Sequence, residues 1–457
     1  MNNDIEPFLA SSFRDPCGRV MRLGAQLYRS VTPAGMEDYR HFTRCGLSQS
    51  LIEKRVLVPF QEAGRRGDDL LLQLEELPFI SYPYEWCFSQ LRDAAVLTLR
   101  IALEALQKEM ILKDASAFNI AWHEGKPIFI DHGSFTRYHD GEPWQAYRQF
   151  TMHFLGPLLL MKYRDIRHLQ LFRSHLDGLP LDFVSRHLPL KTWFSPGILM
   201  HIHLHSRFEQ SHSDSMRPVQ AKPPKMPRNR LRDMLQHLHD YLEDLKVPQN
   251  PSEWGAYYQD TNYSKSAFAH KQELVKEFIS RVQPRRTVDF GANNGTFSFL
   301  ATGNSSIVIA ADCDAAALES LYQRARKDFP GVYPVLQDLN NPSPGLGIFN
   351  TERESFLSRA RCDLALGLAL LHHLRIGSNW TLRQCIELFA QTAPNALLEF
   401  VPKTDSQLQR LLRTRPDICD DWTLPALLSV CQKYYRACES VPINDSQRVL
   451  IRLQQRL

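Results

Sequence analysis

The stretch VDFGANNGTFS, residues 288–298, decides the fold of the C-terminal half of this 457-residue chain. It begins as an apolar strand, passes through a tight turn and continues into residues that favour a helix. Gly291 and Gly295 let the backbone approach a ligand where a side chain would collide. Asn293 stands between them, and asparagine is one of the few residues with a side chain that tolerates positive φ. The stretch therefore predicts a ligand-binding turn between a buried strand and a helix.

Short apolar runs recur along the C-terminal half and alternate with helical patterns. We expect strands at 286–290, 306–311, 332–336, 363–368 and 396–401. This alternation is typical of a parallel sheet with helices on both faces. Two further strand patterns, 434–443 and 448–454, are joined by the turn residues 444–447 and predict an antiparallel hairpin. The fold class is therefore α/β, with a Rossmann-like sheet of seven strands that ends in this hairpin.

Three acids stand at or just after the ends of neighbouring predicted strands: Asp289, Asp312 and Asp338. Open α/β sheets bind ligands at the carboxyl ends of their strands. At such a place the Asp312 carboxylate can accept hydrogen bonds from both hydroxyls of a ribose, and Asp338 can meet an adenine amino group. The alternative is that the three acids only cap their loops.

This ordered set resembles the class I S-adenosylmethionine-dependent methyltransferases. DFGANNG at 289–295 is similar to their first motif, D/E-x-G-x-G-x-G, with Asn293 in place of the second glycine. CDLALGLALLHHL at 362–374 is similar to their fourth-strand motif. An NAD site fits less well, because G-x-G-x-x-G is absent. The resemblance spans roughly 254–457 and implies a set of S-adenosylmethionine-binding residues: Asp289, Gly291, Asn293, Gly295, Asp312 and Asp338.

His372 and His373 follow the fourth predicted strand at the rim of the expected pocket. Methyl transfer requires alignment of nucleophile, methyl carbon and sulfur, and an oxygen nucleophile also benefits from a general base. Because imidazole titrates near neutral pH, either histidine is a candidate base. The alternative is that both only shape the pocket. Further polar candidates for the substrate mouth are Tyr263, Lys271, Glu399, Lys403 and Asp405.

The N-terminal half carries a second set of polar residues, within LKDASAFNI at 112–120 and IFIDHGSF at 128–135. Asp114 could orient a hydroxyl, while Asn119 and Asp131 could hold Mg²⁺ on ATP phosphates. The pattern resembles the catalytic and metal loops of the kinase-like, aminoglycoside-phosphotransferase-like α+β fold. A glycine-rich loop and a clear strand lysine are missing from the sequence. A degenerate kinase fold, an active kinase and simple turn capping all stay open.

Four prolines between 212 and 229 predict an extended connector. We therefore expect a kinase-like domain at 1–211 and a methyltransferase domain at 230–457. An amphipathic helix with leucines at 231, 235, 238, 242 and 245 opens the second domain in this division. His201, His203 and His205 precede the connector and would share one face of a strand, where they could bind a metal.

Composition limits the partners of the chain. The net charge is +4 without a long basic run, so we expect no nucleic-acid partner. The sequence contains no run of about 18 apolar residues, so we expect no membrane span. Nine scattered cysteines without a CxxC motif, and no export signal, predict a cytoplasmic location. The oligomeric state stays open.

The sequence therefore predicts an S-adenosylmethionine-dependent methyltransferase that acts on a small-molecule or glycan hydroxyl. FISYPYEW at 79–86 and EFVPK at 399–403 add a resemblance to methyltransferases of the nodulation and host-specificity type. That resemblance implies a glycan, lipo-oligosaccharide or other small-molecule acceptor. The alternatives are a bifunctional kinase–methyltransferase, which would also use Mg·ATP, and a cofactor-binding scaffold without catalysis.

Overall fold

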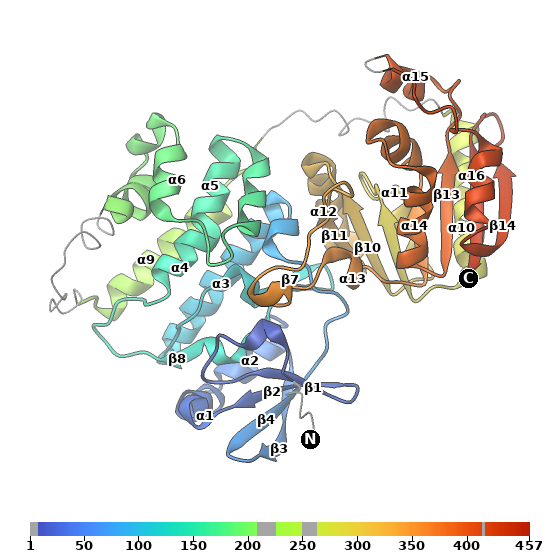
Figure 1. Ribbon diagram of the computed structural model, residues 1–457. Helices are drawn as coiled ribbons and strands as arrows, with labels where there is room; N and C mark the ends of the chain where they lie inside the picture. Colours follow the sequence, from blue (N-terminus) through green and yellow to red (C-terminus); the bar gives the residue numbers. More distant parts are fainter. Residues whose placement is uncertain (1–7, 208–224, 249–262, 414–415) are drawn as a thin grey trace. The chain divides into compact units, whose positions relative to one another are not determined.

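A computed structural model describes residues 8–207, 225–248, 263–413 and 416–457. The chain divides into two compact units (Figure 1). Unit 1 comprises residues 1–249 together with 345–353, and unit 2 comprises residues 250–344 together with 354–457. Among the described residues, no helix has both the length and the apolar character that a membrane crossing requires.

Unit 2 is built on one sheet of seven strands, in the order β11-β10-β9-β12-β13-β15-β14. The first five in this order run parallel, and β15 and β14 pair antiparallel at the end of the sheet. Its strands are β9 Arg286–Phe290, β10 Ile307–Asp312, β11 Val332–Leu336, β12 Leu364–Gly367, β13 Asn395–Phe400, β14 Tyr435–Pro442 and β15 Val449–Arg456. Each strand lies within two residues of its predicted bounds.

The parallel strands are buried on both faces, as their continuous apolar character requires. Helices pack on them: α10 contacts β13 and α11, α12 contacts β10 and β11, and α14 contacts β13 and α16 (Figure 1). The helices of this unit are α10 Lys265–Val282, α11 Thr296–Ala301, α12 Ala315–Asp328, α13 Phe356–Arg359, α14 Leu382–Thr392, α15 Ser406–Leu412 and α16 Leu424–Cys431.

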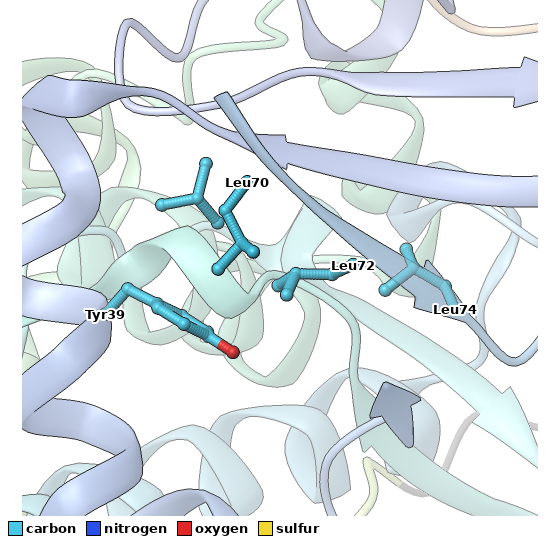
Figure 2. Close-up of a cluster of buried hydrophobic side chains, with 5 residues drawn as sticks. Tyr39, Leu70, Leu72 and Leu74 are labelled. Atoms are coloured by element: carbon cyan, nitrogen blue, oxygen red, sulfur yellow. The ribbon is translucent and has the colours of Figure 1, made fainter. Parts of the chain in front are cut away.

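Unit 1 contains a four-stranded antiparallel sheet in the order β1-β2-β4-β3. The strands are β1 Val20–Leu23, β2 Gln26–Val31, β3 Phe60–Arg66 and β4 Asp69–Leu74. Helix α1, Met36–Arg44, packs on this sheet through Tyr39. Figure 2 shows the Tyr39 side chain pointing toward Leu70 and Leu72 of β4, with Leu74 of the same cluster farther along the strand. The sheet therefore buries one face against α1.

Most of the remainder of unit 1 is helical. The longest helix, α3 Phe88–Gln107, is buried along much of its length. Two short two-stranded antiparallel sheets accompany it, one from β5 Met110–Leu112 and β8 Phe135–Arg137, the other from β6 Ile120–His123 and β7 Lys126–Phe129. The other helices are α2 Leu47–Glu53, α4 Tyr147–Phe150, α5 Gly156–Tyr163, α6 Leu181–His187, α7 Pro196–Ile198 and α9 Arg228–Glu243.

Helix α9 belongs to unit 1, although its position after the connector predicted that it opens the second domain. Its leucine stripe is buried, and the helix packs on α3. The amphipathic pattern predicts that the helix needs an apolar partner but cannot say which one. Most of the expected connector, 212–224, lies outside the described residues.

We predict that Leu235→Ala destabilises unit 1. Leu235 is fully buried in α9, so the truncation leaves a cavity that costs about 2–5 kcal/mol. Gln236→Ala on the exposed side of the same helix should change stability by no more than about 0.5 kcal/mol. Urea unfolding of the full chain, followed by circular dichroism, measures both. Equal effects of the two substitutions would contradict the assignment of α9 to the core.

Candidate functional site

The turn between β9 and α11 has the backbone that its sequence predicts. Gly291, Asn293 and Gly295 all have positive φ, at 74°, 51° and 85°. A Cβ at position 295 would lie 2.8 Å from the Phe299 ring, so glycine is required there for space as well as conformation. Asparagine replaces the middle glycine because its side chain is compatible with the left-handed region.

Asp312 ends β10 and holds this turn in place. One of its carboxylate oxygens accepts the Asn293 backbone N–H at 2.7 Å, and the other accepts the Asp314 N–H at 2.8 Å. Burial raises the pKa of Asp312 to about 6. A carboxylate has about four acceptor positions, so Asp312 keeps acceptor capacity beyond these two hydrogen bonds.

Asp289 lies inside the sheet, on β9. It is 2% exposed, and its carboxylate accepts a hydrogen bond from Ser298 on α11 at 2.6 Å. Burial raises the pKa of Asp289 to about 7, despite that hydrogen bond. Its contact with Ser298 makes it a link between β9 and α11.

Asp338 follows β11 and is exposed. Its carboxylate accepts the Asn340 backbone N–H at 2.9 Å, so it also caps its own loop. The Asn340 side chain accepts a hydrogen bond from the Trp380 indole at 3.1 Å. The loop after β11 is thereby joined to residues that follow β12.

These residues fit an adenosyl cofactor. The turn at 291–295 keeps backbone within reach of a ligand, and Asp312 offers spare acceptor positions at the end of the neighbouring strand. This combination suits a ribose diol beside a glycine-rich turn. Asp289, Gly291, Asn293, Gly295 and Asp312 come together through the pairing of β9 with β10.

The loop after β12 lies against the same turn. A Cβ built on Gly291 would be 3.4 Å from the Leu370 side chain, and His372 and His373 follow two and three residues later. Ala369, in the same loop, has a positive φ of 52°. Such a conformation is strained for alanine and is often found at functional sites.

His372 is buried, and its Nδ1 has no hydrogen-bond partner among the described residues. Its ring centroid lies 4.1 Å from that of His373. Burial, and next the neighbouring His373, lower the pKa of His372 well below its ordinary value. Burial also lowers the pKa of His373, to about 4, and the charge of Arg448 adds to this effect. Both rings are therefore neutral at physiological pH.

A buried ionic network lies beside the histidines. Glu399, at 0% exposure on β13, pairs with Lys271 of α10 at 2.6 Å and with Arg448 at 3.4 Å. Arg448 also pairs with Asp405 at 2.8 Å, and the Tyr263 hydroxyl donates to Glu399. Burial alone would raise the pKa of Glu399, but the two cations hold it below its ordinary value. The two carboxylates of this network thus balance its two cations.

The sequence named four members of this network, Tyr263, Lys271, Glu399 and Asp405, and missed Arg448. Arg448 stands just before β15, in a segment that the sequence marked only as a strand of the hairpin. Its role follows from the pairing of β15 with β13, which brings it beside Glu399. Lys403 lies apart from the network and pairs with Asp417 near the surface.

The N-terminal polar residues are arranged differently. Asp131 pairs with Arg29 of β2 at 2.6 Å and accepts a hydrogen bond from the Ser134 hydroxyl. Arg29 is 5% exposed and also pairs with Asp15 at 2.5 Å. Burial alone would raise the pKa of Asp131, but the guanidinium of Arg29 keeps it below its ordinary value. The charge that would attract a metal ion is therefore already neutralised by the protein.

Asn119 and Asp114 are also occupied by local contacts. Asn119 donates to the Ser134 hydroxyl at 3.1 Å, and Asp114 accepts the Ser116 N–H at 2.9 Å. Lys54, which follows helix α2, pairs with Glu104 at 2.7 Å. In this arrangement the residues do not fit Mg²⁺, because the cation beside Asp131 is an arginine.

The HxHxH residues lie on a helix rather than on a strand. A π-helical segment, Leu199–Leu204, carries His201 and His203, and the rings of His201 and His205 both pack against Tyr147. His201 accepts or donates a hydrogen bond with the Tyr147 hydroxyl at 2.6 Å, and His203 contacts Ser185 and Thr192 and stacks on Trp193. The one compact His/acid group among the described residues is instead His239, Asp240 and Glu243, on the surface of α9.

The chain is 33% identical over 454 residues to nodulation protein NoeA of Rhizobium meliloti (strain 1021). The match covers 97% of this chain and 95% of that protein. The chain belongs to the NoeA family of nodulation proteins. No protein-family model matches this chain.

Two solved structures are similar to part of this NoeA-family chain. N-methyltransferase NodS from Bradyrhizobium japonicum WM9 is 11% identical, with a TM-score of 0.31, over 42% of this chain and 98% of that one. Magnesium protoporphyrin IX methyltransferase (ChlM) from Synechocystis PCC 6803 with bound SAH is 15% identical, with a TM-score of 0.32, over 44% and 92%. At these scores the likeness decides nothing about this chain.

We predict that Asp289→Asn changes how the stability of this NoeA-family protein depends on pH. A carboxyl whose pKa is raised to about 7 binds more protons in the folded than in the unfolded state between about pH 4 and 7. The wild type therefore loses stability across that window as pH rises, and the amide, which still accepts from Ser298, does not. The difference in the free energy of unfolding, variant minus wild type, should therefore rise by about 2–4 kcal/mol between pH 4 and pH 8.

Urea unfolding at pH 4.5, 6 and 8 measures this difference. Asp328→Asn is the matched control, because Asp328 is exposed at the end of α12. A stability difference between Asp289→Asn and wild type that stays constant with pH would contradict the buried, protonated state of Asp289.

Proposed function

We propose that this protein is an S-adenosylmethionine-dependent methyltransferase that acts on a hydroxyl of a small molecule or glycan. The observation that carries the proposal is the contact between two loops. The positive-φ turn at 291–295, held by Asp312, lies against the loop that presents the buried, neutral His372. A cofactor site and a proton acceptor are thus neighbours.

On the cofactor side, Asp312 would accept the ribose hydroxyls, and the backbone at 291–295 would lie along the rest of the nucleoside. Asp338 would serve the adenine side, from its exposed place after β11. When bound, S-adenosylmethionine supplies an electrophilic methyl group on a sulfonium. The residues of the turn hold the group that carries it in one position, and this alignment is the main contribution an enzyme makes to methyl transfer.

On the acceptor side, His372 would take the proton of the attacking hydroxyl at its Nδ1. This atom is buried and has no partner among the described residues, so it is free to accept a hydrogen bond. A depressed pKa keeps the ring in its basic form at physiological pH, at the cost of weaker basicity. Lys271 is within electrostatic reach of both Asp289 and His372, which places the ionic network beside both halves of the site.

The ionic network also indicates the charge of the acceptor. Lys271 and Arg448 are balanced by Glu399 and Asp405, so the buried groups carry no net charge. A charged acceptor would add a buried charge without a partner, which is costly. A neutral, polar acceptor such as a sugar hydroxyl therefore suits this site better than a charged one.

The kinase alternative receives no support from the N-terminal residues, because Arg29 holds Asp131 where a metal ion would be needed. The scaffold alternative requires cofactor binding without a proton acceptor. The unpartnered nitrogen of His372 favours the enzyme over the scaffold.

We predict that S-adenosylhomocysteine binds the wild type and that Asp312→Ala weakens its binding at least tenfold. Loss of one or two hydrogen bonds to a carboxylate costs about 1.5–3 kcal/mol each. Asp328→Ala, which removes an exposed acid from α12, should leave the affinity unchanged. Isothermal titration calorimetry measures the affinity of the wild type and both variants for S-adenosylhomocysteine. If S-adenosylhomocysteine does not bind the wild type, the proposed function is wrong.

We predict that His372→Gln lowers kcat about 10²- to 10⁴-fold and leaves the affinity for S-adenosylhomocysteine unchanged. The assay is transfer of label from methyl-tritiated S-adenosylmethionine to a panel of neutral oligosaccharides and small alcohols. Because the pKa of His372 lies well below its ordinary value, protonation of this ring should not lower the wild-type kcat between pH 8 and pH 6. His373→Gln is the matched variant, and a larger loss there would move the base to His373.

A further inference from the structure

The outward side of α1 in unit 1 carries a concentration of positive charge. Tyr39 points into the buried cluster beside β4 (Figure 2). Phe42 is buried as well, so the opposite side of the helix faces outward. Arg40 and Arg44 are one helical turn apart on that outward side, and both are exposed. Their positions therefore follow from the packing of Tyr39 against the sheet.

This side of α1 forms one wall of an open hollow of about 730 Å³. Arg65, from the end of β3, and Arg137, which ends β8, form further parts of the lining. All residues that line the hollow belong to unit 1, and none of them is Asp114, Asn119 or Asp131. Its volume is in the range of about 300–1,000 Å³ that is typical of small-molecule sites.

The acids in the lining do not neutralise the four arginines. Only Glu37 and Asp68 are present, which leaves a formal charge of +2. Glu37 pairs with Arg137 at 2.9 Å, and Arg65 donates to the Asp68 backbone carbonyl at 3.1 Å. The four guanidiniums thus divide into two with local partners and two without.

Arg40 and Arg44 are the two without. Within the described residues, neither guanidinium has a carboxylate partner. His41, between them in the sequence, adds a buried Nε2 that has no hydrogen-bond partner in this part of the chain. Unpaired arginines are the side chains best suited to phosphate and sulfate groups, which they bind through two parallel hydrogen bonds.

We propose that this hollow, lined by Arg40, Arg44, Arg65 and Arg137, is a binding site for a small organic ligand with at least two phosphate or sulfate groups. Two unpaired guanidiniums match two anionic groups. The volume leaves room for the body of the ligand, and Met36 provides an apolar surface for it. The site belongs to unit 1 and is independent of the methyl-transfer proposal, which concerns unit 2.

The test is isothermal titration calorimetry of the full chain with two probes, sodium pyrophosphate and sucrose octasulfate, at low ionic strength. We expect at least one probe to bind with a Kd below about 1 mM. The double variant Arg40→Gln/Arg44→Gln should bind it at least about tenfold more weakly. Binding should weaken as NaCl rises from about 50 to about 500 mM, because the ion pairs are exposed and screened. Preference between the probes distinguishes a phosphate from a sulfate ligand.

Arg230→Gln/Arg232→Gln on α9 is the matched control, because it removes the same charge from exposed positions outside the hollow. It should keep the wild-type affinity. Circular dichroism and S-adenosylhomocysteine titration check that each variant is folded. The proposal is overturned if neither probe binds the wild type at about 5 mM, or if the control loses as much affinity as Arg40→Gln/Arg44→Gln.

Discussion

The hydrogen bond from the Asn293 backbone to Asp312 joins the carboxyl ends of β9 and β10. It holds a turn of left-handed residues against an acid whose pKa burial raises to about 6. The loop that carries His372 then packs on the same turn through Leu370. The candidate site of this NoeA-family protein depends on that one bond, because it fixes the edge of the sheet at which the other groups meet.

The protein uses buried charge in two different ways. In unit 2, Lys271, Glu399, Arg448 and Asp405 form a balanced set. It lies near His372, whose Nδ1 has no hydrogen-bond partner among the described residues. In unit 1, Arg29 lies between Asp15 and Asp131 and satisfies both. In a buried pair of this kind, removal of one partner is destabilising because it leaves the other charge buried without compensation. The first arrangement joins α10, β13 and the start of β15, whereas the second joins β2 to the loop that follows β7.

The surface of unit 1 shows a third use of charge. Arg40 and Arg44 stand on the outer side of a helix whose inner side is fixed by Tyr39. Their guanidiniums face water without acids of their own, in contrast to Arg29. Positive charge is thus neutralised in the interior of unit 1 and left available at its surface.

The sequence by itself determined the elements that depend on local chemistry. The alternation of apolar runs fixed the strands of unit 2 to within two residues, and the glycines and Asn293 fixed the turn, because few other residues adopt positive φ. The tertiary structure alone decided which distant groups meet. Arg448 reaches Glu399 only through the pairing of β15 with β13, Arg29 reaches Asp131 across unit 1, and α9 packs on α3 rather than on unit 2. Local pattern specifies that a charge or an apolar stripe needs a partner, whereas the identity of that partner depends on contacts between residues far apart in the chain.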